Sequence, residues 1–143
     1  MPALDPDECR RWFAAARHAH LATADTDGVP HVVPVTFALL DGPDGPEVVS
    51  AVDHKPKTTT DLRRLRNAVA NPVVSLLVDT YDDDWSRLWW VRADGVAQVE
   101  EAGAPREDAL TALAARYEPY RARRPEGPLL RVAVRRWRGW TAR

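Results

Sequence analysis

The chain contains two lysines, and both lie in one short polar segment. Lys55 and Lys57 belong to residues 53–60, between a Val-rich stretch and a helical pattern. Threonines at positions 58–60 follow the second lysine. Ammonium groups, hydroxyl groups and the free N–H groups of a helix N-terminus all donate hydrogen bonds to anions. The segment therefore predicts an anion site, and a phosphate group suits this set of donors.

A second interpretation of the same segment needs no ligand. Thr59 or Thr60 can cap the following helix, while both lysines remain solvated. The segment is not a P-loop, because no Gly-rich run precedes a Gly-Lys-Ser/Thr sequence. The remaining basic residues are all arginines, which is typical of a GC-rich genome, so a retained pair of lysines favours the ligand interpretation.

Tryptophans are concentrated in residues 85–90, which contain three of the six in the chain. Trp89 and Trp90 are adjacent, so on a strand one side chain faces inward and the other outward. The inward indole is expected in the core. The outward indole, with Arg87 and Arg92 nearby, is suited to stacking on a planar ring or to filling a dimer interface.

Other reactive residues do not form a recognisable catalytic or metal-binding set. His18 and His20 have strand-like spacing, but no carboxylate or third ligand completes a metal site, so no metal is expected. Cys9 is the only cysteine, and it lies in an expected helix with no partner for nucleophilic catalysis. No Ser-His-Asp or Gly-x-Ser-x-Gly pattern occurs, and no catalytic residue is identified.

The elements that position these residues are mostly strands. Apolar alternation and turn residues predict six strands at residues 20–24, 29–40, 47–52, 73–79, 88–99 and 129–140. Helices are expected at residues 5–17, 61–71 and 105–117, and residues 121–128 are expected to form a loop. Pro30 and Pro34 must lie at an edge, a bulge or the start of a strand, and Gly95 is expected to bend or bulge its strand. The pattern indicates a mainly β fold, an antiparallel barrel with peripheral helices, formed by one domain over residues 1–143.

Charge and hydropathy exclude several classes of protein. The net charge is −1, which does not support binding to nucleic acid. The basic and aromatic residues 135–140 are interpreted as the end of the last strand, with Trp137 and Trp140 packing across a dimer, rather than as a nucleic-acid or membrane site. No apolar run is long enough for a membrane span, and no signal peptide is recognised, so a cytoplasmic location is expected.

Several of these segments resemble one family. The sequences His-Leu-Ala-Thr-Ala at residues 20–24 and Gly-Val-Pro-His-Val-Val-Pro-Val-Thr-Phe at residues 28–37 resemble the opening hairpin of pyridoxamine 5′-phosphate oxidase-like split barrels. Residues 54–57, 66–76 and 82–92 resemble one branch, the actinobacterial "PPOX class" flavin/deazaflavin oxidoreductases that use coenzyme F420. The similarity covers roughly residues 10–140, and the combination of lysine segment and tryptophan strand is its most specific part.

The resemblance implies a six-stranded antiparallel split β-barrel of the FMN-binding type, acting as a homodimer with a cofactor at the subunit interface. It implies that Lys55, Lys57 and Thr58 contact the phosphate of the cofactor tail. It also implies that the backbone of Pro34, Val35 and Thr36 lies against the ring, with Ser50, Ala51 and Val52 beside it. It further implies that Trp85, Arg87 or Trp89 completes the pocket from the other subunit.

The functional expectation is an F420-dependent oxidoreductase that transfers a hydride to or from a small organic substrate. The alternatives are an FMN-dependent enzyme of the same fold and a non-catalytic protein that binds a cofactor or haem. The segment between Lys57 and the helix is longer than in many FMN-binding members, which weighs against FMN rather than against the fold. The substrate-binding residues of the true oxidases are not recognisable, so vitamin synthesis is not expected.

Overall fold

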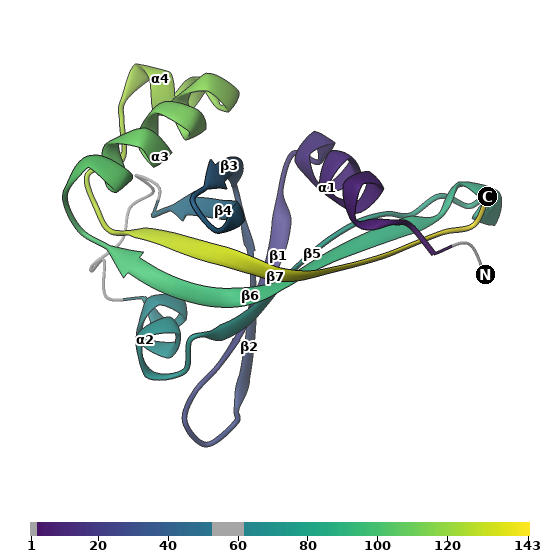
Figure 1. The fold of residues 1–143 in the computed structure, drawn as a ribbon, viewed down its shortest axis with the longest axis horizontal. Coiled ribbons are helices and arrows are strands. Elements are labelled where there is room, and N and C mark those ends of the chain that lie inside the picture. The colour runs from purple at the N-terminus through teal and green to yellow at the C-terminus, as the bar shows by residue number, and fades with distance from the viewer. Residues whose placement is uncertain (1–2, 53–61) are drawn as a thin grey trace.

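The structure is a computed structural model that describes residues 3–52 and 62–143 (Figure 1). Its strands are β1 (Ala19–Ala24), β2 (Pro30–Val35), β3 (Ala38–Gly42), β4 (Gly45–Ala51), β5 (Val73–Thr80), β6 (Trp89–Glu100) and β7 (Leu129–Thr141). Its helices are α1 (Pro6–Ala15), α2 (Arg63–Ala70), α3 (Ala104–Arg116), α4 (Glu118–Ala122) and the short 3-10 helix η1 (Trp85–Arg87). None of these helices is long and apolar enough to cross a bilayer.

The strands form one antiparallel sheet of seven strands, in the order β2-β1-β5-β6-β7-β4-β3. The prediction of six strands is therefore wrong by one, because residues 29–40 form two strands rather than one. Thr36 and Phe37 separate β2 from β3, and these two strands lie at opposite edges of the sheet. Within the described residues the sheet is not closed, and the chain crosses from one edge to the other in these two residues.

Prolines and glycines lie where strand geometry tolerates them. Pro30 begins β2, and Pro34 lies in the same edge strand, where a missing N–H group is least disruptive. The pairing of β1 with β2 is regular from Ala24↔Pro30 to Ala19↔Val35, so Pro34 does not form a bulge. The register between β6 and β7 shifts between Asp94 and Gly95, which confirms the place of the predicted irregularity, but the extra residue is Arg135 of β7 rather than a residue of β6.

Helix α1 begins with a capping box. The Asp5 carboxylate accepts from the Glu8 backbone N–H, and the Glu8 side chain accepts from the Asp5 N–H. The helix buries Phe13, whose ring lies 4.8 Å from that of Phe37 and 5.4 Å from that of Trp137. Trp137, expected at a dimer interface, therefore packs inside its own chain.

Two apolar cores stabilise the sheet from different sides. Helices α1 and α2 pack against the inward side chains of β1, β5, β6 and β7. Helix α3 covers the other side of β3 and β4, where Leu113 packs with Val49 and Leu129. Figure 1 shows α3 and α4 together at one end of the molecule, beside β3 and β4. Among the described residues, no helix packs on the other side of β1, β2 and β5.

Helix α4 was not predicted. It begins directly after α3, with Pro119 in its first turn, where the missing N–H group is tolerated. The sequence analysis treated the Arg- and Pro-containing residues 121–128 as a loop, although α4 extends to Ala122. Its tertiary role comes from Tyr120, which is buried in the core below α3.

Candidate functional site

The side of β2, β1, β5 and β6 that faces away from α1 and α2 carries an open pocket. We call this side the outer face. Because strand side chains alternate, the residues that point outward come from every second position of β2, β1, β5 and β6. The pocket has a volume of about 500 Å³ and is lined by His20, Ala22, Val32, Ser75, Leu77, Asp79, Trp90 and Arg92. Val32 is 61% exposed and Leu77 is 37% exposed, so the outer face presents apolar surface to its surroundings.

A polar cluster lies at one side of this pocket. The Arg92 guanidinium donates from Nε to Asp94 Oδ1 over 2.7 Å and from Nη2 to Oδ2 over 3.1 Å. The Ser75 hydroxyl donates to the same Oδ1 over 2.7 Å. Partial burial alone would raise the pKa of Asp94, but the bonds from Arg92 and Ser75 outweigh it and lower that pKa below its usual value. The cluster therefore contains an ionised carboxylate held rigidly by its neighbours.

Trp90 is the outward indole of the tryptophan segment. Its ring lies 5.9 Å from the Arg92 guanidinium carbon, in the range of a cation–π contact. Trp89 faces the opposite way and packs edge-on against Trp12, with 5.2 Å between the ring centroids. The prediction that one indole faces inward and the other outward is confirmed.

Two groups of predicted site residues come together at the edge of the sheet. Pro34, which is exposed, and Val35, which is buried, end β2 and lead through Thr36 into the two-residue crossover. Because Ala38 pairs with Val49 in antiparallel strands, the residues before Ala38 lie next to those after Val49. The crossover therefore lies beside the end of β4. The β4 end consists of Ser50, Ala51 and Val52, all buried, so surface is available there mainly through the backbone.

Lys55, Lys57 and Thr58 lie outside the described residues. The elements on both sides of their segment agree with the sequence analysis, because β4 ends at Ala51 and α2 begins at Arg63. The first turn of α2 is closed by backbone bonds from Leu65 and Arg66 to the Leu62 carbonyl, each 3.1 Å long. A strand thus enters the segment and a helix N-terminus follows it, as predicted.

Two residues of the third group lie far from the other two groups within one chain. Trp85 and Arg87 belong to η1 in the turn between β5 and β6, and Trp85 is 69% exposed. Arg87 is also exposed, with Asp82 and Asp84 carboxylate oxygens 3.9 Å and 3.8 Å from its guanidinium nitrogens. Figure 1 shows this turn next to the C-terminus, at the opposite end of the molecule from α3 and β4. A single chain does not bring Trp85 or Arg87 to the crossover, whereas Trp89 lines a hollow together with Arg17 and His20.

Some residues of the region were not singled out by the sequence analysis. Trp90 and Tyr120 were not proposed as site residues, and His20 was considered only as a metal ligand. Adjacent residues of a strand face opposite sides, so the sequence indicates that either Trp89 or Trp90 faces outward. It does not show which of the two does so. For Tyr120 no such signal exists, because its role depends on how α4 packs.

Three buried side-chain atoms lack a hydrogen-bond partner among the described residues: His31 Nδ1, Arg106 Nε and Trp140 Nε1. Trp140 pairs with Trp90 across β6 and β7, so its indole lies on the outer face. His31 pairs with Thr23, whose hydroxyl accepts from the Asn67 amide over 3.0 Å. Buried polar groups are usually bonded to protein or to ordered water.

The sheet order, the peripheral helices and the edge-to-edge crossover define a split barrel. Residues 5–141 match the family model described as pyridoxamine 5′-phosphate oxidase, and the chain belongs to this family. No curated protein matches the sequence.

Solved structures share the fold at low sequence identity. A conserved hypothetical protein from Mycobacterium tuberculosis is 23% identical with a TM-score of 0.76, over 98% of this chain and 86% of that one. A FAD-binding protein from Mesorhizobium loti is 22% identical with a TM-score of 0.69, over 96% and 93%. The haem storage protein HutZ from Vibrio cholerae is 18% identical with a TM-score of 0.66, over 95% and 93%. At these identities the similarity shows the fold alone.

Proposed function

We propose that the protein is an oxidoreductase that binds a flavin-type cofactor at the interface of a homodimer, with coenzyme F420 as the first candidate. The observation that carries the proposal is the meeting of the β2–β3 crossover with the end of β4, where the lysine segment begins. Membership of the pyridoxamine 5′-phosphate oxidase family supports it. The substrate would be a small organic molecule.

The chemistry of the described residues fits such a cofactor. A flavin-like ring needs a flat apolar surface and polar groups for its edge. Strand β2 lies at the edge of the sheet, and among the described strands only β1 pairs with it, so one side of its backbone is open. The apolar outer face and the Trp90 indole offer a surface on which a planar ring can stack. An anionic tail finds its donors in Lys55, Lys57 and Thr58 of the sequence.

In this proposal each group of residues has a separate task. The backbone of Pro34, Val35 and Thr36 meets the polar edge of the ring, and Ser50, Ala51 and Val52 lie beside it. Trp85, Arg87 and Trp89 of a second copy complete the pocket and exclude water. When bound, the cofactor supplies hydride transfer, while the protein binds and orients the reactants.

The outer face supports the homodimer. It combines exposed Val32 and Leu77 with the Trp90 indole. Aromatic residues surrounded by apolar side chains are typical of the central part of an interface. A second copy would cover this apolar surface and bring the distant β5–β6 turn to another subunit's crossover.

Two alternatives remain within the same fold. One is an FMN- or FAD-type flavin enzyme, since the similar protein of Mesorhizobium loti is described as FAD-binding. The other is haem binding without turnover, since HutZ is described as a haem storage protein. The choice of F420 rests on the resemblance of residues 54–57, 66–76 and 82–92 to the deazaflavin branch.

Titration of the purified protein with F420, FMN, FAD and haemin, followed by tryptophan quenching, tests the choice. Quenching by F420 at the lowest concentration supports the proposal. Tight binding of FMN or FAD with none of F420 identifies a flavin enzyme instead. A Soret band after haemin addition, without flavin or F420 binding, identifies a haem protein.

Removal of the lysine pair tests the phosphate site. The double variant Lys55→Ala with Lys57→Ala should weaken F420 binding roughly 10- to 100-fold, because each charge-assisted hydrogen bond contributes about 1.5–3 kcal/mol and part of this is screened by solvent. The matched control is Arg11→Ala with Arg123→Ala, which removes the same charge from exposed positions. Equal affinity in the lysine double variant and the wild type would show that the tail binds elsewhere.

A further inference from the structure

The crossover between β2 and β3 receives its support from outside the sheet. Thr36 and Phe37 belong to neither strand, so no regular ladder satisfies their backbone groups. The Phe37 ring is nevertheless fully buried, against Phe13 of α1. The polar groups of these two residues are instead bonded by side chains from α3, from α4 and from Tyr117 between them.

Tyr117 contributes the first of these contacts. Its hydroxyl oxygen accepts from the Phe37 backbone N–H over 3.2 Å. The same hydroxyl lies 3.0 Å from the Phe37 carbonyl oxygen and 2.8 Å from the Arg17 carbonyl oxygen. Since the hydroxyl has a single proton, it donates to one of these carbonyls at a time. Tyr117 thereby connects the crossover to the segment that follows α1.

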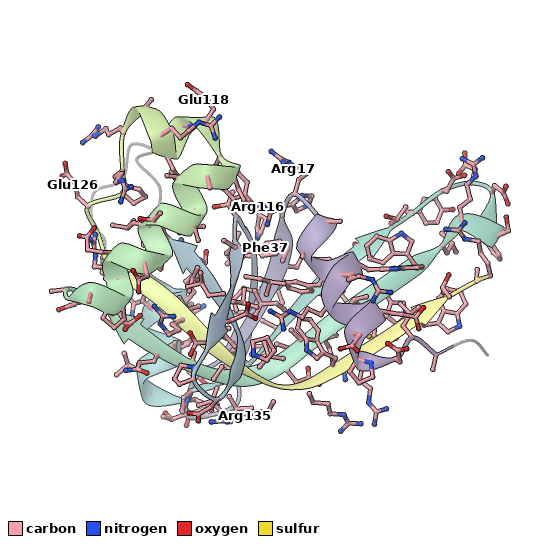
Figure 2. All side chains as sticks on the ribbon, turned by 45° about the horizontal axis from the view of Figure 1, so that its top comes forward. Arg17, Phe37, Arg116, Glu118, Glu126 and Arg135 are labelled. Atoms are coloured by element: carbon pink, nitrogen blue, oxygen red, sulfur yellow. The ribbon has the colours of Figure 1, made fainter. Side chains whose placement is uncertain are left out.

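Arg116 strengthens the same connection. Its Nη1 donates to the Phe37 carbonyl over 2.8 Å, and its Nη2 donates to the Ala16 carbonyl over 2.5 Å. The guanidinium carbon lies 4.8 Å from the centroid of the Phe37 ring and 5.2 Å from that of Tyr117. Figure 2 shows Arg116 and Phe37 between α3 and α1, with Arg17 above them. One side chain thus joins the end of α3, the end of α1 and the crossover.

Tyr120 reaches the crossover from α4. Its hydroxyl oxygen lies 2.9 Å from Thr36 Oγ1, and either group can donate. Tyr120 is 5% exposed, and its ring packs edge-on against Tyr117 at 5.7 Å. A hydrogen bond in such a buried place is directional and is little disturbed by water. The position of Thr36 therefore depends on where α4 places one phenol group.

We infer that Arg116, Tyr117 and Tyr120 are positioning residues for the cofactor ring. They fix residues 36–37, and through them the segment of Pro34, Val35 and Thr36 against which the ring is proposed to lie. The inference rests on the proposed function and adds to it a set of positioning residues that lie away from the ring. The residues where α3 and α4 meet thus determine the position of the ring, although none of these three side chains is assigned to contact it.

Thr36→Val and Tyr120→Phe test the inference, since each removes one hydroxyl group and keeps the shape of the side chain. The affinity for F420, or for whichever cofactor the wild type binds, should fall about three- to tenfold in each variant. The absorption maximum of the bound cofactor should shift, because the ring meets a displaced backbone. The double variant should lose no more than the larger single loss, because both changes break the same bond.

Thr111→Val is the matched control. The Thr111 hydroxyl donates to the Glu107 carbonyl over 3.1 Å within α3, so this variant loses a hydroxyl bond that does not reach the crossover. Its cofactor affinity and spectrum should equal those of the wild type. Binding with unchanged affinity and spectrum in both Thr36→Val and Tyr120→Phe overturns the inference alone. Absence of binding by the wild type overturns the proposed function and the inference together, and it is visible before any variant is made.

Hydrogen exchange tests the contact between Tyr117 and the crossover without any cofactor. In Tyr117→Phe the Phe37 amide loses its acceptor, so this amide should exchange at least tenfold faster than in the wild type. Tyr81→Phe, which changes an exposed tyrosine near the β5–β6 turn, should leave the Phe37 amide unchanged. Equal exchange of that amide in Tyr117→Phe and the wild type overturns the inference, because the crossover would then be fixed by other contacts.

Discussion

The carboxylate of Asp94 shows how single residues stabilise the outer face. It receives two bonds from Arg92 and one from Ser75, which pairs with it across β5 and β6. Because its folded-state pKa is lowered, the ionised form binds its neighbours better than the protonated form does. The contribution to stability is complete above the pKa of the unfolded chain and is lost as the pH falls through the folded pKa.

Asp94→Asn should therefore destabilise the protein at neutral pH by about 1 kcal/mol, since the pair is partly exposed and solvent weakens it. The difference in unfolding free energy between wild type and variant should shrink as the pH falls below about 4, where the carboxylate of the unfolded chain begins to bind a proton, and it should be lost as the pH reaches the lowered pKa of the folded state. Urea denaturation from pH 7 to pH 3 measures it. Asp83→Asn, at an exposed position, is the control, and a difference that is constant with pH would contradict the prediction.

At the scale of the element, the bulge between β6 and β7 has its extra residue, Arg135, in β7 and lies beside Gly95 of β6. A Cβ atom at this position would lie 2.3 Å from the Ala133 carbonyl oxygen and 2.9 Å from Val132 Cγ1. The first neighbour is backbone in the paired strand β7, so it cannot rotate away as a side chain can. The two longest strands thus approach each other more closely here than a side chain permits.

Gly95→Ala should lower the unfolding free energy by about 1–3 kcal/mol, the usual cost of overpacking a well-packed site. Thermal and urea unfolding followed by circular dichroism measure this loss. Val96→Ala, at the exposed neighbouring position, should change the unfolding free energy by no more than about 0.5 kcal/mol. A Gly95→Ala protein as stable as wild type would show that β7 shifts to accommodate the methyl group.

Elements with strong local signals could be predicted from the sequence. The alternation of residues 129–140 and the capping residues Asp5 and Pro6 depend only on neighbours along the chain. The break of residues 29–40 into two strands does not depend on such neighbours. The Val-rich alternation continues through Thr36, and the break follows only from the pairing of β2 and β3 at opposite edges of the sheet. The contacts at the site could not be predicted for the same reason. Bonds such as that between Tyr120 and Thr36 join residues 84 positions apart and produce no periodic pattern in the sequence.

At the scale of the whole molecule, the outer face is the surface that most needs a partner. The pocket between β2 and β6 is largely apolar, and Leu77 lies in the middle of it, paired with His20 on one side and with Arg92 on the other. If a second copy covered the face, an arginine at this point would lose its hydration and place a bulky charged group in an apolar contact.

Leu77→Arg should therefore convert the proposed homodimer into a monomer, measured by sedimentation equilibrium or light scattering at several concentrations. The cofactor should dissociate with the dimer, because its pocket is proposed to need both copies. Thr111→Arg, on the exposed side of α3, should leave the mass unchanged. A wild-type protein that is monomeric at all concentrations would contradict the homodimer, and a dimeric Leu77→Arg protein would place the interface elsewhere.

The strand order has a consequence for how the chain acquires this shape. The hairpin of β3 and β4 joins the remaining sheet through β7, as in the pair Glu47↔Ala133, so it waits for a strand synthesised more than 80 residues later. Until residues 129–141 leave the ribosome, one edge of β4 is unpaired, and the apolar side chains that pack with Leu129, Leu130 and Val132 are incompletely covered. Such distant pairings slow folding, and the nascent chain exposes these surfaces to aggregation or to chaperones for the longest time.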